Sequence, residues 1–335
     1  MINMFFKQAE KNGVTIELLL TKKCNFFCGH CMYSCSSSNS SKYMSDKILG
    51  KVKRQVDFLN SLGLPVIINL VGGEPTLNMK KFKHIFDLVA TWNVDLTMST
   101  NGWWLKEEKT TEKFFKIIKP HIREDGFFFS KKTNKRFLVR VSDDAYHKEQ
   151  REARGLPIDL GIPLRKYLEK SNINVHEERP FIFIQNGFVD TYWVFPNGRG
   201  KDVSDLNTVY ERLGINGSYC FTDLNEQDRL ENIHYNPDGL IEDGCMNGSY
   251  YDVGTVDDNI LYCILLIKLY KAWRFDIGKK YNCYNCRVMF QAWKMKYLKE
   301  ARASYSAWNS FDKDKFLEFR KATSEHQKEI TDEKE

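Results

Sequence analysis

Residues 14–31 read VTIELLLTKKCNFFCGHC, and this stretch sets the beginning of the fold. Its first seven residues form a short apolar run of strand length. The run leads directly into three cysteines, Cys24, Cys28 and Cys31. Ser45 then provides a cap for a helix in which apolar residues recur at helical spacing, namely Ile48, Val52, Val56 and Leu59. The stretch therefore predicts a strand, a cysteine-bearing loop and a helix.

The same alternation of strands and amphipathic helices continues through the first two hundred residues. Alternation of this kind predicts an α/β fold with a parallel sheet and helices outside it. In parallel α/β barrels the chemistry lies at the carboxyl ends of the strands, so the segments that follow each strand are the candidate site. The further strands that we expect are Val66–Val71, Val94–Met98, Phe137–Val141 and Pro180–Ile184, with helices at Lys80–Trp92, Thr111–Ile122 and Pro163–Lys170.

The composition is that of a globular protein of 335 residues with no apolar run long enough for a membrane span and no apolar amino-terminal signal. We therefore expect a cytoplasmic protein with no membrane partner. Nine cysteines in that compartment should be thiols, so their clustering points to metal or catalysis instead of disulfides. The net charge of +6 comes from lysines spread along the chain, which a mixed solvated surface explains, so nucleic acid is not the expected partner.

The cysteine segment is the strongest chemical signal. Three thiolates in a CxxxCxxC pattern can hold three irons of a cubane cluster and leave the fourth iron open for another ligand. The alternative is a zinc site that takes His30 or Cys35 as a fourth ligand. Common structural zinc sites pair CxxC elements, so the segment favours iron and sulfur over zinc.

A second motif, Gly72-Gly73-Glu74-Pro75, follows the strand that ends at Val71. Glycines let a ligand approach the backbone, and a glutamate can accept hydrogen bonds from an ammonium group. Together, the cysteine segment and this motif resemble the radical S-adenosylmethionine (radical SAM) superfamily, whose members share both in this order. The resemblance implies that Cys24, Cys28 and Cys31 hold a [4Fe-4S] cluster, that His30 lies near the adenine, and that Gly72, Gly73 and Glu74 hold the methionine amino group.

Two weaker segments resemble the family in position. Ser99-Thr100-Asn101-Gly102 follows the third strand, and Ser142-Asp143-Asp144-Ala145-Tyr146-His147 follows the fourth. Each could equally be a helix cap or an Asx-turn. The resemblance implies that polar side chains here line the S-adenosylmethionine and substrate pocket, and the candidates are Ser99, Asn101, Ser142 and Asp144.

The carboxyl-terminal part carries further cysteines. Asn236-Pro237-Asp238-Gly239 predicts a tight turn that places Cys245 at the end of a hairpin. The region resembles the Twitch version of the SPASM-type auxiliary domain, which implies a second [4Fe-4S] cluster on Cys220, Cys245, Cys283 and Cys286. A structural zinc site on the same four cysteines is the alternative. Cys263 lies in an apolar helical stretch and is expected to be a buried thiol.

These observations predict a partial (β/α)6 TIM-type barrel over residues 12–205, an auxiliary-cluster domain over 206–290 and a helical tail over 291–335. The resemblance implies reductive cleavage of S-adenosylmethionine to a 5'-deoxyadenosyl radical, with an electron donor of flavodoxin or ferredoxin type. We expect a peptide or protein side chain as substrate. A small-molecule dehydrogenase of the aminoglycoside-biosynthesis type, a tRNA- or nucleotide-modifying enzyme and a zinc-stabilised binding module are the alternatives.

Overall fold

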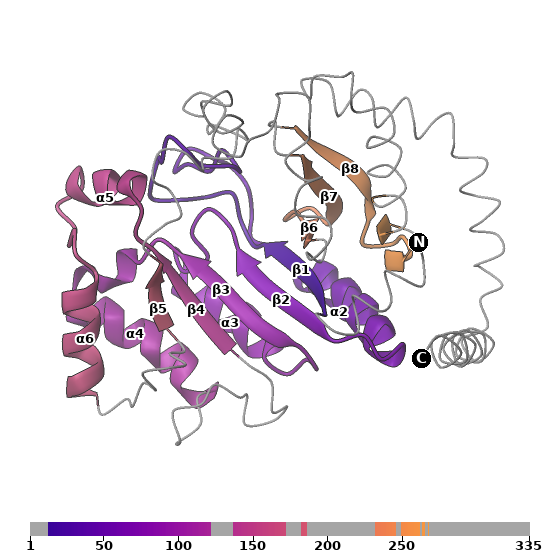
Figure 1. Cartoon of the computed structure of the whole chain (residues 1–335), viewed down its shortest axis with the longest axis horizontal. Coiled ribbons are helices and arrows are strands. Elements are labelled where there is room, and N and C mark those ends of the chain that lie inside the picture. The colour runs from indigo at the N-terminus through magenta and orange to yellow at the C-terminus, as the bar shows by residue number, and fades with distance from the viewer. Residues whose placement is uncertain are drawn as a thin grey trace, which may run out of the picture.

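The computed structural model describes residues 13–121, 137–171, 182–185, 232–245, 249–261, 263, 264 and 267. The described residues form a layered α/β structure around one sheet, as the alternation predicts (Figure 1). Within the described part of the chain, no helix has both the length and the apolar character needed to cross a bilayer.

The sheet has eight strands in the order β5-β4-β3-β2-β1-β6-β7-β8 (Figure 1). All pairings from β5 through β1 to β6 are parallel, and the two pairings among β6, β7 and β8 are antiparallel. The parallel order brings the carboxyl ends of six strands to one edge of the sheet. The strands are β1 Val14–Leu19, β2 Val66–Val71, β3 Asp95–Thr100, β4 Phe137–Ser142, β5 Ile182–Gln185, β6 Asn232–Tyr235, β7 Leu240–Cys245 and β8 Ser249–Thr255.

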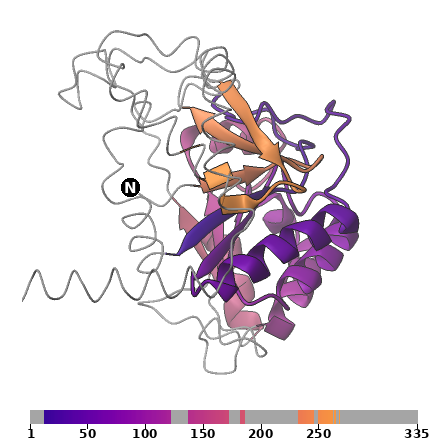
Figure 2. The same ribbon diagram turned by 90° about the vertical axis from the view of Figure 1, so that its right-hand side faces the viewer.

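Helices cover one face of the parallel strands, where their apolar sides join the core (Figure 2). Helix α2 begins where the sequence predicts, because the Ser45 side chain accepts a hydrogen bond of 3.4 Å from the Ile48 amide. Val52, Val56 and Leu59 are buried as predicted, whereas Leu49 is buried more deeply than Ile48 at the first turn. The helices are α2 Asp46–Ser61, α3 Met79–Val89, α4 Glu108–Ile118, α5 Ala145–Glu152 and α6 Gly161–Lys170.

Helix α4 differs from its predicted bounds at both ends. It starts three residues earlier than expected, directly after the 3-10 turn Trp103–Lys106, and the Thr110 hydroxyl donates 2.7 Å to the Trp104 carbonyl there. It ends at Ile118 because the chain tightens into a second 3-10 turn, Lys119–His121, which contains a proline.

The expected auxiliary region contributes strands to this same sheet. Strand β6 pairs in parallel with β1, placing His234 beside Glu17. The predicted turn after β6 is confirmed: the Asn236 side-chain oxygen accepts the Asp238 and Leu240 amides at 3.0 Å each, and Gly239 has φ 85°. Strand β7 ends at Cys245, whereas Cys220, Cys283 and Cys286 lie outside the described residues.

Candidate active site at the carboxyl ends of the strands

The loop that follows β1 carries the three predicted cluster cysteines in a largely buried setting. Cys24 is 7% exposed and Cys28 6% exposed, while Cys31 is partly buried. The loop folds on itself, since the Cys31 amide donates 3.2 Å to the Cys28 carbonyl and the Phe26 amide donates 3.3 Å to the Cys24 sulfur. The loop thus presents all three thiols from one short, hydrogen-bonded turn of backbone.

The three cysteine sulfurs are not gathered as closely as a single metal ion would require. A tetrahedral zinc with Zn–S bonds of about 2.3 Å would bring its sulfurs to about 3.8 Å from one another. Among the described residues, no three cysteine sulfurs lie within 4.8 Å of one another, with or without the side chain of His30. In a cubane each thiolate binds a different iron, so the sulfurs stand farther apart. Three thiols presented from one short loop are the donor set that a [4Fe-4S] cluster with one open iron takes.

Burial raises the pKa of the Cys24 thiol to about 12, and the charge of Glu74 adds to that effect. The amides of Phe26 and Asn101 oppose it by donating to the sulfur. Cys35 is also buried, at 1% exposed, and its amide donates 3.3 Å to the Cys31 sulfur. The hydrogen bond with Cys31 and, after it, burial raise the pKa of the Cys35 thiol. This fourth thiol is therefore part of the cysteine loop's interior.

The Gly72-Gly73-Glu74 segment lies directly against the cysteine loop. The Gly73 amide donates 2.7 Å to the Thr21 carbonyl, and the Glu74 amide donates 2.9 Å to the Lys23 carbonyl. A β-carbon at position 73 would stand 2.1 Å from the Lys23 carbonyl oxygen and 2.9 Å from the Cys24 β-carbon. Only glycine permits this approach, so residue 73 determines how closely the two motifs meet.

The Glu74 carboxylate lies fully buried and accepts hydrogen bonds from protein donors on both of its oxygens. Its Oε1 accepts from the Thr76 amide at 3.0 Å and from the Thr100 hydroxyl at 2.9 Å, and its Oε2 accepts from the Asn101 amide at 2.7 Å. Burial raises the pKa of Glu74, and these donors oppose the shift. In the structure, the Glu74 side chain therefore ties the ends of β2 and β3 together.

Asn101, a predicted site residue, also reaches the cysteine loop. Its side-chain amide donates 2.9 Å to the Asn25 side-chain oxygen and lies 3.7 Å from the Cys24 sulfur. Ser99 and Ser142 are half-buried residues of β3 and β4, and the Ser142 carbonyl accepts a hydrogen bond of 3.1 Å from Arg151. The structure thus brings Asn101 to the cluster loop and leaves Ser99 and Ser142 on the strands.

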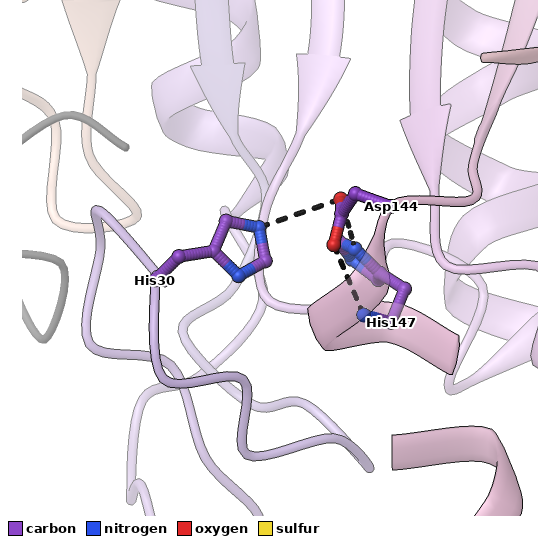
Figure 3. A group of neighbouring side chains, drawn as sticks. All are labelled: His30, Asp144 and His147. Atoms are coloured by element: carbon purple, nitrogen blue, oxygen red, sulfur yellow. Dashed lines mark hydrogen bonds and ion pairs between the residues drawn. The ribbon is translucent and has the colours of Figure 1, made fainter. Parts of the chain in front are cut away.

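His30 meets the segment that follows β4 (Figure 3). Its Nε2 lies 3.5 Å from Asp144 Oδ2, which also lies 2.5 Å from His147 Nδ1, and its ring stacks on Tyr146 with centroids 4.6 Å apart. Asp144 further caps helix α5 by accepting 3.0 Å from the His147 amide. Burial alone would raise the pKa of Asp144, but both histidines outweigh it and hold that pKa well below its usual range.

One atom of His30 marks a binding position. The Nδ1 atom is buried, and no group in the described part of the chain hydrogen-bonds to it. A buried ring nitrogen without a partner loses free energy unless a ligand supplies one. An adenine, which offers both donors and acceptors, fits this need beside the cysteine loop.

The sequence did not predict two side chains, Arg151 and Trp103, that stabilise the carboxyl-terminal edge of the parallel strands. Arg151 on α5 is fully buried and forms an ion pair with Asp143, and the Trp103 indole donates 2.8 Å to the Thr76 hydroxyl beside Glu74. A single arginine in a polar helix and a tryptophan after a strand carry no motif of their own. Only the spatial proximity of β2, β3 and α5 reveals what they do.

Comparison with known proteins gives a family for the first part of the chain. Residues 18–125 match the model of the Radical SAM superfamily. The chain is 26% identical over 101 residues to "Putative peptide biosynthesis protein YydG" of Bacillus subtilis (strain 168), covering 30% of each protein. It is 33% identical over 87 residues to "S-adenosylmethionine-dependent nucleotide dehydratase" of Selenomonas ruminantium, covering 26% of this chain and 29% of that protein. The chain therefore spans less than a third of either relative's length.

Solved structures resemble the chain more loosely. A crystal structure of BtrN in complex with AdoMet and 2-DOIA covers 75% of this chain and 81% of its own, at 14% identity and a TM-score of 0.44. A crystal structure of Streptococcus suis SuiB bound to S-adenosylmethionine covers 78% of this chain and 48% of its own, at 14% identity and a TM-score of 0.35. Likeness at this level does not establish a shared activity.

Proposed function

We propose that this chain, whose residues 18–125 form a radical SAM domain, binds a [4Fe-4S] cluster on Cys24, Cys28 and Cys31 and cleaves S-adenosylmethionine reductively. When bound, the cluster and S-adenosylmethionine would supply a 5'-deoxyadenosyl radical that removes a hydrogen atom from a substrate. The observation that best supports this proposal is the close contact of Gly73 with the Lys23 carbonyl. This contact holds the cysteine loop against the segment that would receive S-adenosylmethionine.

In this proposal, residues of the chain bind S-adenosylmethionine and orient it against the cluster. Gly72, Gly73 and Glu74 would receive the methionine amino group, and Glu74 Oε2, which accepts from the Asn101 amide, has a second lone pair for it. His30, held by Asp144 and Tyr146, would face the adenine with its unpartnered Nδ1. Asn101 would steady the Cys24 thiolate by donating to its sulfur.

A peptide or protein side chain is the substrate that we propose. Support comes from the relative in Bacillus subtilis, whose name refers to peptide biosynthesis. A small molecule is the second candidate, because the relative in Selenomonas ruminantium is named for action on a nucleotide. The two relatives match similar shares of the chain, so the test must include both substrate classes.

An auxiliary [4Fe-4S] cluster on Cys220, Cys245, Cys283 and Cys286 and an external electron donor of flavodoxin or ferredoxin type complete the proposal. A second cluster could accept the electron left on a substrate radical or position the substrate. With both clusters, the anaerobically purified protein should contain roughly eight irons per chain. A zinc-stabilised binding module would instead be colourless and contain zinc.

The experiment compares Cys28→Ala with Cys35→Ala, a matched loss of a buried thiol in the same loop. Release of 5'-deoxyadenosine from S-adenosylmethionine is measured under reducing, anaerobic conditions. We expect Cys28→Ala to abolish release and Cys35→Ala to retain it, while Cys283→Ala keeps some uncoupled cleavage. Release by Cys28→Ala, or its complete loss in Cys35→Ala, would overturn the assignment of the three cluster ligands.

A further inference from the structure

The face of the sheet opposite the helices carries a polar row that crosses five strands. Strands β6, β1, β2, β3 and β4 lie side by side in the sheet (Figure 1). His234, Glu17, Asn69 and Thr97 occupy paired positions on the first four of them, and Arg140 of β4 reaches Thr97. Asn69 donates 2.9 Å to Glu17, Thr97 donates 2.9 Å to Asn69, and Arg140 Nη2 donates 3.4 Å to Thr97. These five residues, here called the polar row, form one connected chain of hydrogen bonds.

The Glu17 end of the polar row is balanced in charge. His234 Nδ1 lies 2.8 Å from Glu17 Oε2, and the Tyr33 hydroxyl donates 2.9 Å to the same oxygen. Asn69 occupies the other carboxylate oxygen. A partly buried carboxylate with this many donors needs nothing from outside the protein.

The Arg140 end is not balanced. Its Nε is buried without a hydrogen-bond partner, and toward the described residues its side chain donates one long hydrogen bond, to Thr97. Across the described residues, no carboxylate lies within ion-pair distance of this guanidinium, although the same sheet edge pairs Arg151 with Asp143. Burial lowers the pKa of Arg140, and the charge of Glu17, which forms no ion pair with it, opposes that shift. A partly desolvated guanidinium without an ion-pair partner is a place where a ligand can provide a direct counter-charge.

The position of Arg140 joins it to the proposed active site. It lies two residues before the end of β4, and the chain continues from there into Asp143 and Asp144, which contact Arg151 and His30. In parallel α/β barrels, substrates enter from this carboxyl edge of the strands. A group bound to Arg140 would therefore lie on the polar face of the sheet, near the carboxyl ends of the strands where S-adenosylmethionine is proposed to bind.

We propose that Arg140 binds an oxyanion of the substrate, a carboxylate or a phosphate, through the edge formed by Nε and an Nη atom. This inference rests on the proposed function, since it names the substrate class for the same site. The guanidinium fork matches both oxyanions in a bidentate way, which a lysine cannot do. Thr97 on β3, which itself donates to Asn69, holds the guanidinium of Arg140 in place through their hydrogen bond.

The experiment measures binding by isothermal titration calorimetry to the anaerobic full-length protein with its cluster and S-adenosylmethionine. The probes are the peptide acetyl-Ala-Glu-Ala-amide, its glutamine counterpart and inorganic phosphate. We compare the wild type with Arg140→Gln, Arg140→Lys and Lys53→Gln, which removes an exposed positive charge on α2 as a control. Binding of the glutamate peptide points to a carboxylate, and binding of phosphate points to a phosphorylated small molecule.

We expect the wild type to bind one anionic probe and not the glutamine peptide. Arg140→Gln and Arg140→Lys should weaken that binding by about 10- to 100-fold, and Lys53→Gln should leave it unchanged. Thermal unfolding checks folding, and Arg140→Gln should not lower the melting temperature, because it removes an uncompensated buried charge. Equal binding by wild type and Arg140→Gln, or binding of no anion, would overturn the inference.

Release of 5'-deoxyadenosine by the wild type without substrate separates the two proposals. If release occurs but neither anion binds at Arg140, the oxyanion inference fails and the proposed function stands. If an anion binds at Arg140 but the wild type releases no 5'-deoxyadenosine, the proposed function fails and the anion site stands.

Discussion

The Nδ1 atom of His234 lies 2.8 Å from the Oε2 atom of Glu17, so strands β1 and β6 are joined by an ion pair as well as by their ladder. Burial alone would raise the pKa of Glu17. The charge of His234 and the hydrogen bonds from His234, Asn69 and Tyr33 outweigh burial and lower the pKa to about 2. The carboxylate is therefore more acidic in the folded chain than in the unfolded one.

This shift predicts how stability depends on pH. Since the folded pKa of Glu17 is below its ordinary value of 4.5, its contribution of about 3 kcal/mol is present above pH 4.5 and is lost as the pH falls from 4.5 to 2. Urea unfolding at several pH values should show a shallower loss of stability in Glu17→Gln over that window. An identical pH slope in wild type and variant would contradict the prediction.

Gln55 of α2 connects the helix layer to the hairpin that follows β6. Its side-chain amide donates 3.2 Å to the Val256 carbonyl and 2.9 Å to the Asp258 carbonyl, and its oxygen accepts from the buried Tyr235 hydroxyl. Gln55→Leu should destabilise the fold by about 2–4 kcal/mol, because three polar groups lose their partner. Urea unfolding tests this, with Lys53→Leu on the exposed side of α2 expected to change stability by less than about 0.5 kcal/mol.

Gly73→Ala should disrupt cluster assembly. Its new β-carbon would overlap the Lys23 carbonyl and press on Cys24, so the cysteine loop must move. We expect the iron content after anaerobic reconstitution to fall to about half or less, with helix content unchanged by circular dichroism. Gly50→Ala is the control, since nothing lies within 4 Å of its added carbon, and it should stabilise α2 by about 0.5–1 kcal/mol. Full iron loading of Gly73→Ala would show that the close contact is dispensable.

Asp144→Ser removes the carboxylate that contacts both His30 and His147. Serine keeps the cap on α5, so the helix should remain, but the contact that holds the His30 ring is lost. If His30 faces the adenine, the KM for S-adenosylmethionine should rise about tenfold while kcat for 5'-deoxyadenosine release changes less. Asp159→Ser, at an exposed position ahead of α6, serves as the comparison. A fall in kcat with KM unchanged would argue against a positioning role.

The sequence alone was sufficient for the first four elements of the chain, whereas it misplaced the ends of α4 and did not predict α5. Alternating apolar runs predicted β1, α2, β2 and α3 because burial on one side of a strand or helix leaves a local periodic trace. The cysteine segment and the Gly72-Gly73-Glu74 motif could also be recognised from the sequence, because each is a short continuous pattern. Both lie within residues 18–125, which match the model of the Radical SAM superfamily. The residue assignments carried over from that resemblance stay predictions.

Tertiary structure decided what the motifs touch. Nothing in the local sequence shows that the Glu74 carboxylate accepts from Thr100 and Asn101, or that Arg151 has an ion-pair partner while Arg140 has none among the described residues. Likewise, β6 joins the sheet beside β1, which makes His234 a partner of Glu17 across a long stretch of chain. The physical reason is that periodicity records only whether a side chain is buried, whereas charge balance and hydrogen-bond saturation depend on which distant strands become neighbours.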